Sequence, residues 1–480
     1  MIELIREAGK CENIVILVNE PDEIKGYDIL TENECDFALK LFKETKRTLA
    51  GFNRLDHYIF IQKPCIDKIL YKQLEYYRKE GDKLCKQLNM NREKQIIIID
   101  KCKEFRYTLA FAEGMVLGNY RFLKYKTSGS AEAPTLKNVS IISDSIRKSD
   151  IDELNILIES VFFCRDLVNE PLSALTAEKF AKRISTMCTE AGAMADVLNK
   201  TKIESLKMGG LLGVNKGSPE PPTFTVLEWK PAHHVNRKPW VIVGKGIVYD
   251  TGGISLKPSS SMETMKSDMA GGAATAACIY ALAKAGLPVH VIGLVPATEN
   301  RPDGNAYVPG DIIKISDGTN VEVTNTDAEG RLILADALVY AKKYKPGLVI
   351  DIATLTGSAS AAIGRVGMVG FQADAFHDME LMKECGNMVY ERIAEFPFWD
   401  EYADMIKSDI ADIKNTGGRE AGAITAAKFL QHFTDYPFIH LDIAGPAFLE
   451  KPDSYRGTGA TGVTVRLLFD FFKNKCRRNI

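Results

Sequence analysis

Short apolar runs alternate with stretches of helical periodicity along the whole chain. The strand-sized apolar runs are residues 13–18, 57–62, 95–100, 139–144, 223–229, 240–244, 289–295, 312–315, 348–355 and 438–445. Helical spacing of apolar positions predicts helices in the second half at residues 273–285, 331–344, 379–395 and 425–433. The central runs are continuously apolar, as in strands that are buried on both faces. The alternation therefore predicts an α/β fold with mostly parallel or mixed sheets flanked by helices.

A long helical segment separates the strands into two groups. Apolar residues recur at helical spacing throughout residues 151–168. A chain of 480 residues suggests two or three domains, at roughly 150 residues per domain. We therefore expect an N-terminal α/β domain over residues 1–150 with an oligomeric or regulatory role, a connecting helix over 151–172 and a larger domain over 173–480. Ligands of such sheets bind beyond the carboxyl ends of strands, so we expect a site in the loops after the strands of the larger domain.

Charge and cysteine usage exclude several classes of protein. The 61 Lys and Arg residues nearly balance the 63 Asp and Glu residues, which gives a formal net charge of −2. This balance offers no field that would attract nucleic acid or an anionic membrane, and no uncharged apolar run is long enough to span a bilayer. The ten cysteines are scattered singly without a CxxC pair, which indicates a reducing compartment and a cytoplasmic protein.

Two common hydrolytic motifs are absent from the chain. The seven histidines form no HExxH motif, and no GxSxG elbow is present. His440 lies inside a strand-like run, where we expect a packed or hydrogen-bonded core residue. The sequence therefore excludes a zincin and a serine hydrolase of the nucleophile-elbow type.

Chemistry-bearing residues gather in three segments between Trp240 and Leu332. The segments read VIVGKGIVYDTGGISLKP, MKSDMAGGAAT and VTNTDAEGRL, and each lies at a strand end or a helix start. Together they contain four acids: Asp250, Asp268, Asp327 and Glu329. Four carboxylates in one pocket repel one another unless cations compensate their charge. Two divalent cations would neutralise the set, and such a centre typically activates water for hydrolysis, with Mg²⁺, Mn²⁺ or Zn²⁺ bound by oxygen.

Parts of this pattern have local alternatives. Thr326 and Glu329 have the spacing of a capping box at the start of the next helix. Asp327 and Glu329 instead share one face if the segment is extended, and they would then point into one site. Lysine is usually a solvated side chain, and Lys245 or Lys257 taken singly would be read in that way.

The segments resemble those of a known family. NTDAEGRL at residues 325–332 is identical to the signature of the leucyl aminopeptidase family, the dinuclear M17 metallopeptidases. GKGIVYDTGGISLKP and MKSDMAGGAA resemble the two metal-binding loops of this family, and DIATLTG, TGGREAGAITAAKFL and HLDIAGPA resemble its remaining blocks in the same order. The resemblance covers about Arg165 to Leu468 and implies that the larger domain is a catalytic metallopeptidase domain. Residues 1–150 match no motif of the family.

The resemblance implies two divalent metal ions per subunit, Mn²⁺ or Zn²⁺. The positions that match the ligands of the tighter site are Lys245, Asp250, Asp268 and Glu329. Those that match the more exchangeable site are Asp250, Asp327 and Glu329, so that Asp250 and Glu329 would bridge both ions. A lysine ligand must lose a proton whose free pKa is about 10.4, and adjacent dications favour the neutral amine.

The same resemblance implies a leucyl aminopeptidase reaction. Lys257 matches a lysine that polarises the scissile carbonyl and stabilises the oxyanion. Arg331 matches an arginine that holds bicarbonate, the general base toward the bridging water. A hydroxide bridged by the two metals would attack the first peptide carbonyl, while the exchangeable metal and Asp268 bind the free α-amine.

Substrate preference and assembly also follow from the resemblance. The positions that match the side-chain pocket are Met265, Thr354, Gly357, Ala444 and Ala447. An apolar pocket of this kind indicates a leucine-like but broad preference, because one methylene changes binding by only about 1–3 kcal/mol. The implied partners are peptides with a free N-terminus and further copies of the chain in a homohexamer, without nucleic acid or membrane.

Two other functions remain open. An Mg²⁺-dependent phosphohydrolase would use the same four carboxylates but leaves Lys245 and the ordered blocks unexplained. A non-catalytic binding protein that keeps the fold is opposed by the presence of all seven matched polar residues. Assays with peptide amides and phosphoesters discriminate between these functions.

Overall fold

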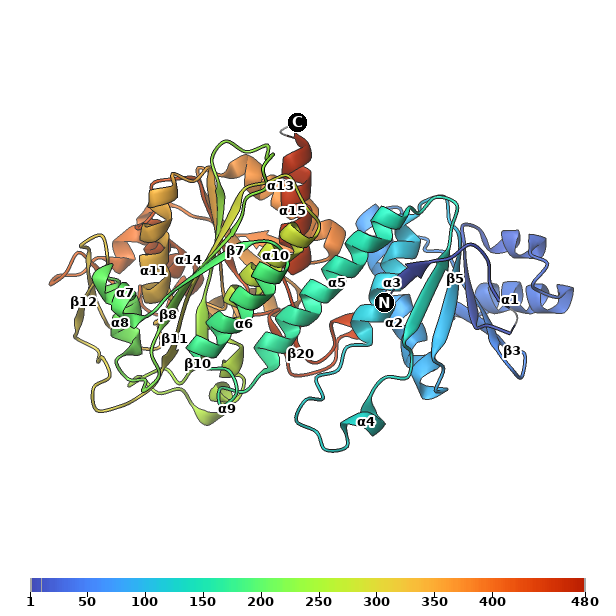
Figure 1. Ribbon diagram of the computed structural model, residues 1–480, viewed down its shortest axis with the longest axis horizontal. Helices are drawn as coiled ribbons and strands as arrows, with labels where there is room; N and C mark the ends of the chain where they lie inside the picture. The colour runs from blue at the N-terminus through green and yellow to red at the C-terminus, as the bar shows by residue number, and fades with distance from the viewer. Residues whose placement is uncertain (1, 10, 479–480) are drawn as a thin grey trace. The chain divides into compact units, whose positions relative to one another are not determined.

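The two groups of apolar runs form two separate sheets, each with helices of its own (Figure 1). The computed structural model describes residues 2–9 and 11–478. These residues form an N-terminal unit that ends at Glu159 and includes Pro452–Gly457, and a C-terminal unit of Ser160–Lys451 and the residues from Thr458 onward. The predicted α/β fold class is confirmed. The expected role of the first domain stays a prediction.

The N-terminal unit is built around a six-stranded sheet. Its strands are, in spatial order, β1 (Ile2–Leu4), β6 (Asn138–Ile142), β5 (Gln95–Lys101), β2 (Ile14–Val18), β4 (Tyr58–Gln62) and β3 (Leu49–Asn53). All neighbouring strands are parallel except β3 and β4, which form an antiparallel pair. Every residue of β2 is buried, which explains why this strand is a continuous apolar run.

Helices cover both faces of this sheet. They are α1 (Glu32–Glu44), α2 (Leu70–Met90), α3 (Arg106–Gly118) and a 3-10 helix, η1 (Pro21–Gly26), whereas the one-turn α4 (Gly129–Glu132) lies in a loop away from the sheet. Figure 1 shows α1 on one face and the α2–α3 pair on the other. The boundary between the units falls within α5 (Lys148–Asn169), and this helix confirms the one predicted over residues 151–168.

The C-terminal unit contains a larger mixed sheet. Its strands are, in spatial order, β16 (Ile393–Glu395), β15 (Met368–Ala373), β18 (Phe438–Asp442), β14 (Leu348–Ala353), β9 (Trp240–Gly244), β11 (Val291–Asn300), β8 (Thr223–Trp229) and β7 (Met194–Leu198), with β10 (Gly246–Asp250) paired to β11. The central strands β18, β14, β9 and β11 are parallel. Their carboxyl ends therefore meet at one edge of the sheet.

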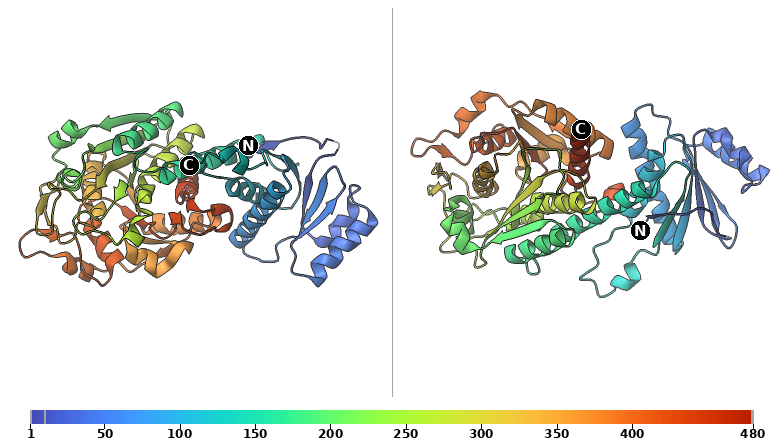
Figure 2. Two further views of the ribbon diagram at one scale, coloured as in Figure 1. Left: turned by 90° about the horizontal axis from the view of Figure 1, so that it is seen from below. Right: turned by 45° about the horizontal axis from the view of Figure 1, so that its top comes forward.

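Two layers of helices enclose this sheet (Figure 2). One layer consists of α6 (Ala177–Glu190), α10 (Ala270–Lys284), α13 (Phe376–Val389) and α15 (Val465–Arg478). The other consists of α7 (Lys200–Ser205), α8 (Gly209–Asn215), α11 (Gly330–Ala341) and α14 (Gly422–Gln431). The remaining elements are the short helices α9 (Ser259–Met262) and α12 (Gly357–Ile363), the small sheet of β12 (Ile312–Lys314), β13 (Asn320–Glu322) and β17 (Ile413–Lys414), and the pair of β19 (Phe448–Leu449) and β20 (Gly459–Ala460).

One predicted helix is too long. The segment expected to be helical over residues 379–395 ends as helix α13 at Val389. Tyr390 then adopts the left-handed conformation with φ 58°, which stops the helix. The chain continues as β16, which pairs with β15. Apolar periodicity did not reveal this stop, because a tyrosine rather than a glycine occupies the left-handed position.

None of the ten cysteines forms a disulfide. No helix in the described residues is long and apolar enough to cross a membrane. His440 is fully buried, its Nδ1 lies within hydrogen-bond distance of Asp351 Oδ1, and its ring stacks on Phe371, which confirms the predicted core position.

The start of α10 packs against the sheet with almost no space. A Cβ atom built on Gly271 would lie 2.0 Å from the carbonyl oxygen of Ile352 in β14. We expect Gly271→Ala to lower the free energy of unfolding by about 1–3 kcal/mol, as other overpacked cores do, in a denaturant titration. Gly304→Ala is the matched control, because a Cβ there meets no atom within 4 Å. Equal stability of the two variants would contradict this close packing.

Candidate metal centre

A cavity of about 690 Å³ opens at the carboxyl edge of the C-terminal sheet. Eleven of the twelve site residues predicted from the sequence line it: Lys245, Asp250, Lys257, Met265, Asp268, Asp327, Glu329, Thr354, Gly357, Ala444 and Ala447. The twelfth, Arg331, is buried in the first turn of α11 and does not line the cavity. The location agrees with the rule that ligands of α/β sheets bind beyond the strand ends.

Loops at strand ends place the charged side chains. Lys245 occupies the break between β9 and β10, where its backbone N–H donates to the carbonyl of Ile352 and its carbonyl accepts from the N–H of Gly272. Asp250 ends β10, and Asp268 follows a 3-10 turn just before α10. The same edge of the sheet therefore receives a cation and two acids from loops that meet in space.

The first turn of α11 is shaped to let Lys245 pass. A Cβ atom on Gly330 would lie 2.5 Å from Cε and 2.7 Å from Nζ of Lys245. A glycine is therefore needed directly after Glu329, because any side chain would displace the amine. This close packing explains sterically why a glycine follows Glu329 in the DAEG sequence.

The alternative of a capping box at this helix is wrong. Thr326 Oγ1 donates to the carbonyl of Gly252 at 2.6 Å and accepts from the backbone N–H of Ser255 at 2.8 Å. Glu329 is itself the N-cap residue, in helical conformation and without a side-chain cap. Asp327 lies in a turn rather than on an extended segment, so the expected extended geometry is also wrong, although both acids reach the cavity.

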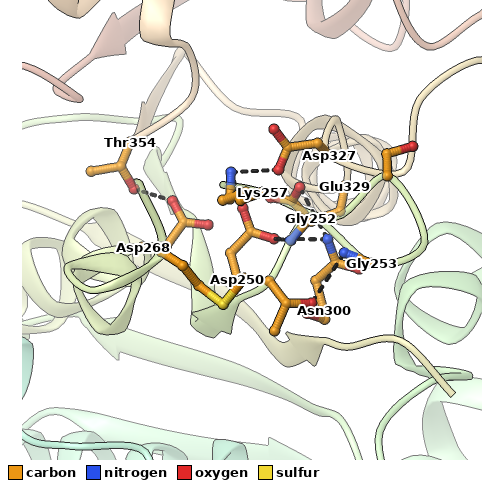
Figure 3. Close-up of polar contacts among 12 residues, drawn as sticks. Asp250, Gly252, Gly253, Lys257, Asp268, Asn300, Asp327, Glu329 and Thr354 are labelled. Atoms are coloured by element: carbon orange, nitrogen blue, oxygen red, sulfur yellow. Dashed lines mark hydrogen bonds and ion pairs between the residues drawn. The ribbon is translucent and has the colours of Figure 1, made fainter. Parts of the chain in front are cut away.

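Two lysines each contact two of the four acids, and Figure 3 shows Lys257 beside Asp327. Lys245 Nζ lies 2.7 Å from Asp268 Oδ2 and 2.9 Å from Glu329 Oε1. Lys257 Nζ lies 2.9 Å from Asp250 Oδ2 and also pairs with Asp327. Four carboxylates and two ammonium groups give this cluster of six side chains a formal charge of −2.

The pKa values show how the acids respond to that excess of negative charge. Burial, together with the neighbouring Glu329, raises the pKa of Asp250 to about 6. Burial also raises the pKa of Asp268 well above its usual range, in spite of Lys245. The pKa of Glu329 is lowered, because the two lysines outweigh its burial. The two lysines therefore compensate only part of the negative charge of the four acids.

The donor set fits divalent cations. One ligand atom each from Asp250, Asp327 and Glu329 lie within 4.8 Å of one another, which is a separation that a single ion can span. Asp268 Oδ2 and Asp327 Oδ1 are buried, and among the described residues each has a lysine ammonium in ion-pair contact but no further hydrogen-bond donor. Oxygen atoms in this state, in a pocket with excess negative charge, suit a hard or borderline cation.

Arg331 lies behind the carboxylates and offers an unused donor. Its Nη1 donates to the carbonyl of Asn415 at 2.5 Å, whereas its buried Nε has no hydrogen-bond partner among the described residues. Burial lowers the pKa of this guanidinium to about 10. The group therefore remains cationic at neutral pH and retains the capacity to bind an anion.

Two buried asparagines support the site and were not predicted. Asn300 ends β11 and donates to Asp250, while Asn415 holds the turn around Asn325 through hydrogen bonds to its backbone. Asn300 ends the strand that begins with the apolar run at residues 289–295, so the rule that ligands bind at strand ends contained a signal for it. No comparable signal marks Asn415, which follows the two-residue strand β17.

Comparison with known proteins agrees with this site. The family profile described as "cytosol aminopeptidase family, catalytic domain" matches residues 162–469. The chain belongs to the cytosol aminopeptidase family. The resemblance seen in the sequence is thereby confirmed, and this membership supports a metal-dependent aminopeptidase, a hydrolase of peptides.

Two relatives of this cytosol aminopeptidase family member are similar to most of the chain. A probable cytosol aminopeptidase of Geobacter sulfurreducens is 44% identical over 373 residues, which are 76% of this chain and 74% of the relative. A probable cytosol aminopeptidase of Chlorobaculum tepidum is 52% identical over 312 residues, 64% of this chain and 61% of that protein.

Solved structures of similar proteins share both units of the fold. The bottromycin maturation enzyme BotP in complex with Mn superposes with a TM-score of 0.85 at 29% identity, covering 97% of this chain and 99% of that one. A mutant of tomato leucine aminopeptidase gives a TM-score of 0.86 at 25% identity, covering 98% and 95%. A metal complex of one neighbour agrees with divalent cations as the cofactors of the family.

Proposed function

We propose that the protein removes leucine-like N-terminal residues, with broad tolerance, from peptides at a centre of two divalent ions, Mn²⁺ or Zn²⁺. Lys245, Asp250, Asp268 and Glu329 would hold the tighter ion, and Asp250, Asp327 and Glu329 the more exchangeable one. The observation that carries this proposal is the convergence of four acids and a buried lysine in one cavity. When bound, the two ions would activate a shared water as hydroxide and polarise the scissile carbonyl.

The difference between the two proposed ion sites is supported by exposure. The Asp268 side chain is 6% exposed and Lys245 is 3% exposed, whereas Asp327 is 33% exposed. An ion held by Asp268 and Lys245 would be shielded from solvent, and one held by Asp327 would exchange more readily. Lys245 would have to bind as a neutral amine, so uptake of the tighter ion would release its proton.

Lys257 is proposed to act directly on the substrate. Burial alone lowers the pKa of this ammonium, but the carboxylates of Asp250 and Glu329 more than compensate and raise it above the usual value. The side chain therefore stays protonated at neutral pH and lines the cavity. A fixed ammonium at this place would polarise the scissile carbonyl and stabilise the oxyanion that forms from it.

The side-chain pocket is proposed to consist of Met265, Thr354, Gly357, Ala444 and Ala447. All five line the same cavity. Small residues dominate the set, and a Cβ on Gly357 would meet no atom within 4 Å. This space suits medium-sized apolar side chains without selecting strictly among them. Asp268 would bind the α-amine together with the exchangeable ion, which restricts hydrolysis to the first residue.

Arg331 is proposed to hold a bicarbonate ion that serves as general base. The unpartnered Nε and the retained positive charge support an anion at this position. We expect Arg331→Ala to lower kcat by about 10²-fold, the lower end of the contribution of a general base. The wild-type rate should rise with added bicarbonate and that of the variant should not. A variant that keeps the wild-type rate and its bicarbonate response would rule out this role.

The assembly and the location of the protein are also proposals. The resemblance to the family suggests a homohexamer, with an oligomeric or regulatory role for the N-terminal unit. Ten free cysteines and relatives that are named cytosol aminopeptidases support a cytoplasmic protein. The formal net charge of −2 gives no reason to expect a nucleic-acid partner.

Metal-dependent hydrolysis of a substrate panel tests the proposed function. Chelated protein would be titrated with Mn²⁺ or Zn²⁺ in the presence of aminoacyl amides, N-acetylated amides and phosphoesters. We expect hydrolysis of free-amine amides only, fastest for leucine-like residues and saturating at two ions per chain. Turnover of phosphoesters instead would favour the phosphohydrolase, and no turnover of any substrate would favour a non-catalytic binding protein.

A further inference from the structure

We propose that Asn300 is a positioning residue of the metal centre, whose side-chain amide fixes the two acids that would bridge both ions. Asn300 is the last residue of β11 and is fully buried. Its Nδ2 donates to Asp250 Oδ1 at 2.8 Å, to the carbonyl of Thr326 at 3.0 Å and to Glu329 Oε2 at 3.4 Å. The inference rests on the proposed function, because it concerns the same ligands.

The side-chain amide of Asn300 connects the end of β11 to two other segments, β10 and the turn before α11 (Figure 3). Asp250 comes from β10, whereas Thr326 and Glu329 belong to the turn before α11. Asn300 also pairs directly with Asp250 in the register of β10 and β11. Its backbone carbonyl accepts from both N and Oγ1 of Thr251, at 3.0 and 2.8 Å. Main chain and side chain of one residue thus hold Asp250 and the start of the next loop.

The orientation of the amide follows from its partners. Turning the group by 180° would place its carbonyl oxygen against the carboxylates of Asp250 and Glu329, where repulsion would replace attraction. In the observed orientation Oδ1 is buried without a hydrogen-bond partner among the described residues, and a Cβ on Gly253 would lie 2.8 Å from it. A buried acceptor without a donor typically costs about 1–3 kcal/mol. The Nδ2 group of Asn300 therefore donates to both acids, while Oδ1 of the same amide is left without a donor among the described residues.

A neutral donor suits this place better than a charged one. A lysine or arginine would add a positive charge next to the bridging acids and would compete with the ions. An aspartate would add repulsion to a cluster of four acids and two lysines that already has a formal charge of −2. The Asn300 amide restricts the rotation of both carboxylates and leaves that charge available to cations. Partners of this kind, placed behind metal ligands, typically affect metal affinity by about 10–100-fold.

Metal affinity of Asn300 variants tests the inference, with Mn²⁺ itself as the probe. Free Mn²⁺ would be followed by electron paramagnetic resonance during titration of the chelated full-length protein. We expect Asn300→Leu and the smaller Asn300→Ser to weaken Mn²⁺ binding by about 10–100-fold. The Ser variant keeps the test decisive if Leu prevents folding, because it is smaller than the native side chain. Circular dichroism of the metal-free proteins reports folding separately.

A second buried asparagine provides the matched control. Asn236 also donates two hydrogen bonds through Nδ2, to the carbonyls of Lys238 and His290, but it lies outside the cavity lining. Asn236→Ser should lower stability and leave the Mn²⁺ affinity within about twofold of wild type, since it touches no proposed ligand. Two tightly bound ions in a folded Asn300 variant, with wild-type affinity, would overturn the inference and leave the proposed function intact. A wild-type protein that binds no pair of ions would overturn the proposed function itself.

Discussion

Replacing Asp250 with asparagine is expected to abolish most of the aminopeptidase activity together with the binding of one Mn²⁺ ion. Asp250 would bridge both ions, and the change removes one of the four negative charges that attract them. A metal centre contributes several kcal/mol to transition-state stabilisation, and about 1.4 kcal/mol corresponds to tenfold in rate. We therefore expect kcat to fall by at least about 10³-fold, measured with a leucine amide at saturating Mn²⁺.

The control for this variant is another buried aspartate in the same unit. Asp336 is fully buried in α11 and accepts from the backbone N–H groups of Leu211 and Ser316, both at 2.9 Å. It does not line the cavity. Asp336→Asn should therefore keep the Mn²⁺ stoichiometry and the rate per folded molecule, although its stability falls. An Asp250→Asn protein that hydrolyses the amide at the wild-type rate would be incompatible with a bridging role.

Replacing Lys257 with methionine should separate catalysis from metal binding. Methionine keeps an unbranched side chain of similar length but cannot donate to a developing oxyanion. Loss of one such donor typically lowers kcat by about 10²–10³-fold. The two ions should still bind, because removal of an ammonium beside Asp250 and Asp327 lowers the competition for these carboxylates. The measurement is kcat and Mn²⁺ stoichiometry on the same preparation.

Lys266 offers a comparison close to the cavity. Its Nζ donates to the backbone carbonyl of Asn169 at 2.7 Å, and it does not line the cavity. Lys266→Met should therefore leave kcat within a few-fold of wild type. If Lys257→Met behaves in the same way, Lys257 has no direct part in the reaction. If Lys257→Met instead loses both ions, Lys257 maintains the structure of the metal site and does not act on the substrate.

Strand positions could be predicted from the sequence because strands that are buried on both faces appear as continuously apolar runs. The runs at residues 240–244 and 348–355 are continuously apolar, and they became β9 and β14 in the middle of the C-terminal sheet. The order of the strands within each sheet has no comparable pattern in the sequence. The pairing of β1 with β6 joins Ile2 to Val139, and the inclusion of Pro452–Gly457 in the N-terminal unit joins segments even farther apart. Local periodicity contains no information on such contacts.

The candidate site was predictable to the extent that its residues are charged. Four acids in three short segments imply a cation centre by charge alone, and the resemblance supplied the individual positions. The conformation of the segments was less accessible, as the turn at Asp327 and the role of Thr326 show. Asn300 was overlooked for a physical reason: a neutral side chain adds nothing to a count of charges, although its amide contacts two acids.

The central claim is that Asp250 and Glu329 hold two divalent ions between them. Anomalous diffraction from crystals grown with Mn²⁺ tests it most directly, because the signal locates manganese without reference to the protein atoms. We expect two anomalous peaks about 3.5–4 Å apart, one beside Asp268 and Lys245 and the other beside Asp327, with the carboxylates of Asp250 and Glu329 reaching both. A single peak, or peaks bound by other side chains, would contradict it.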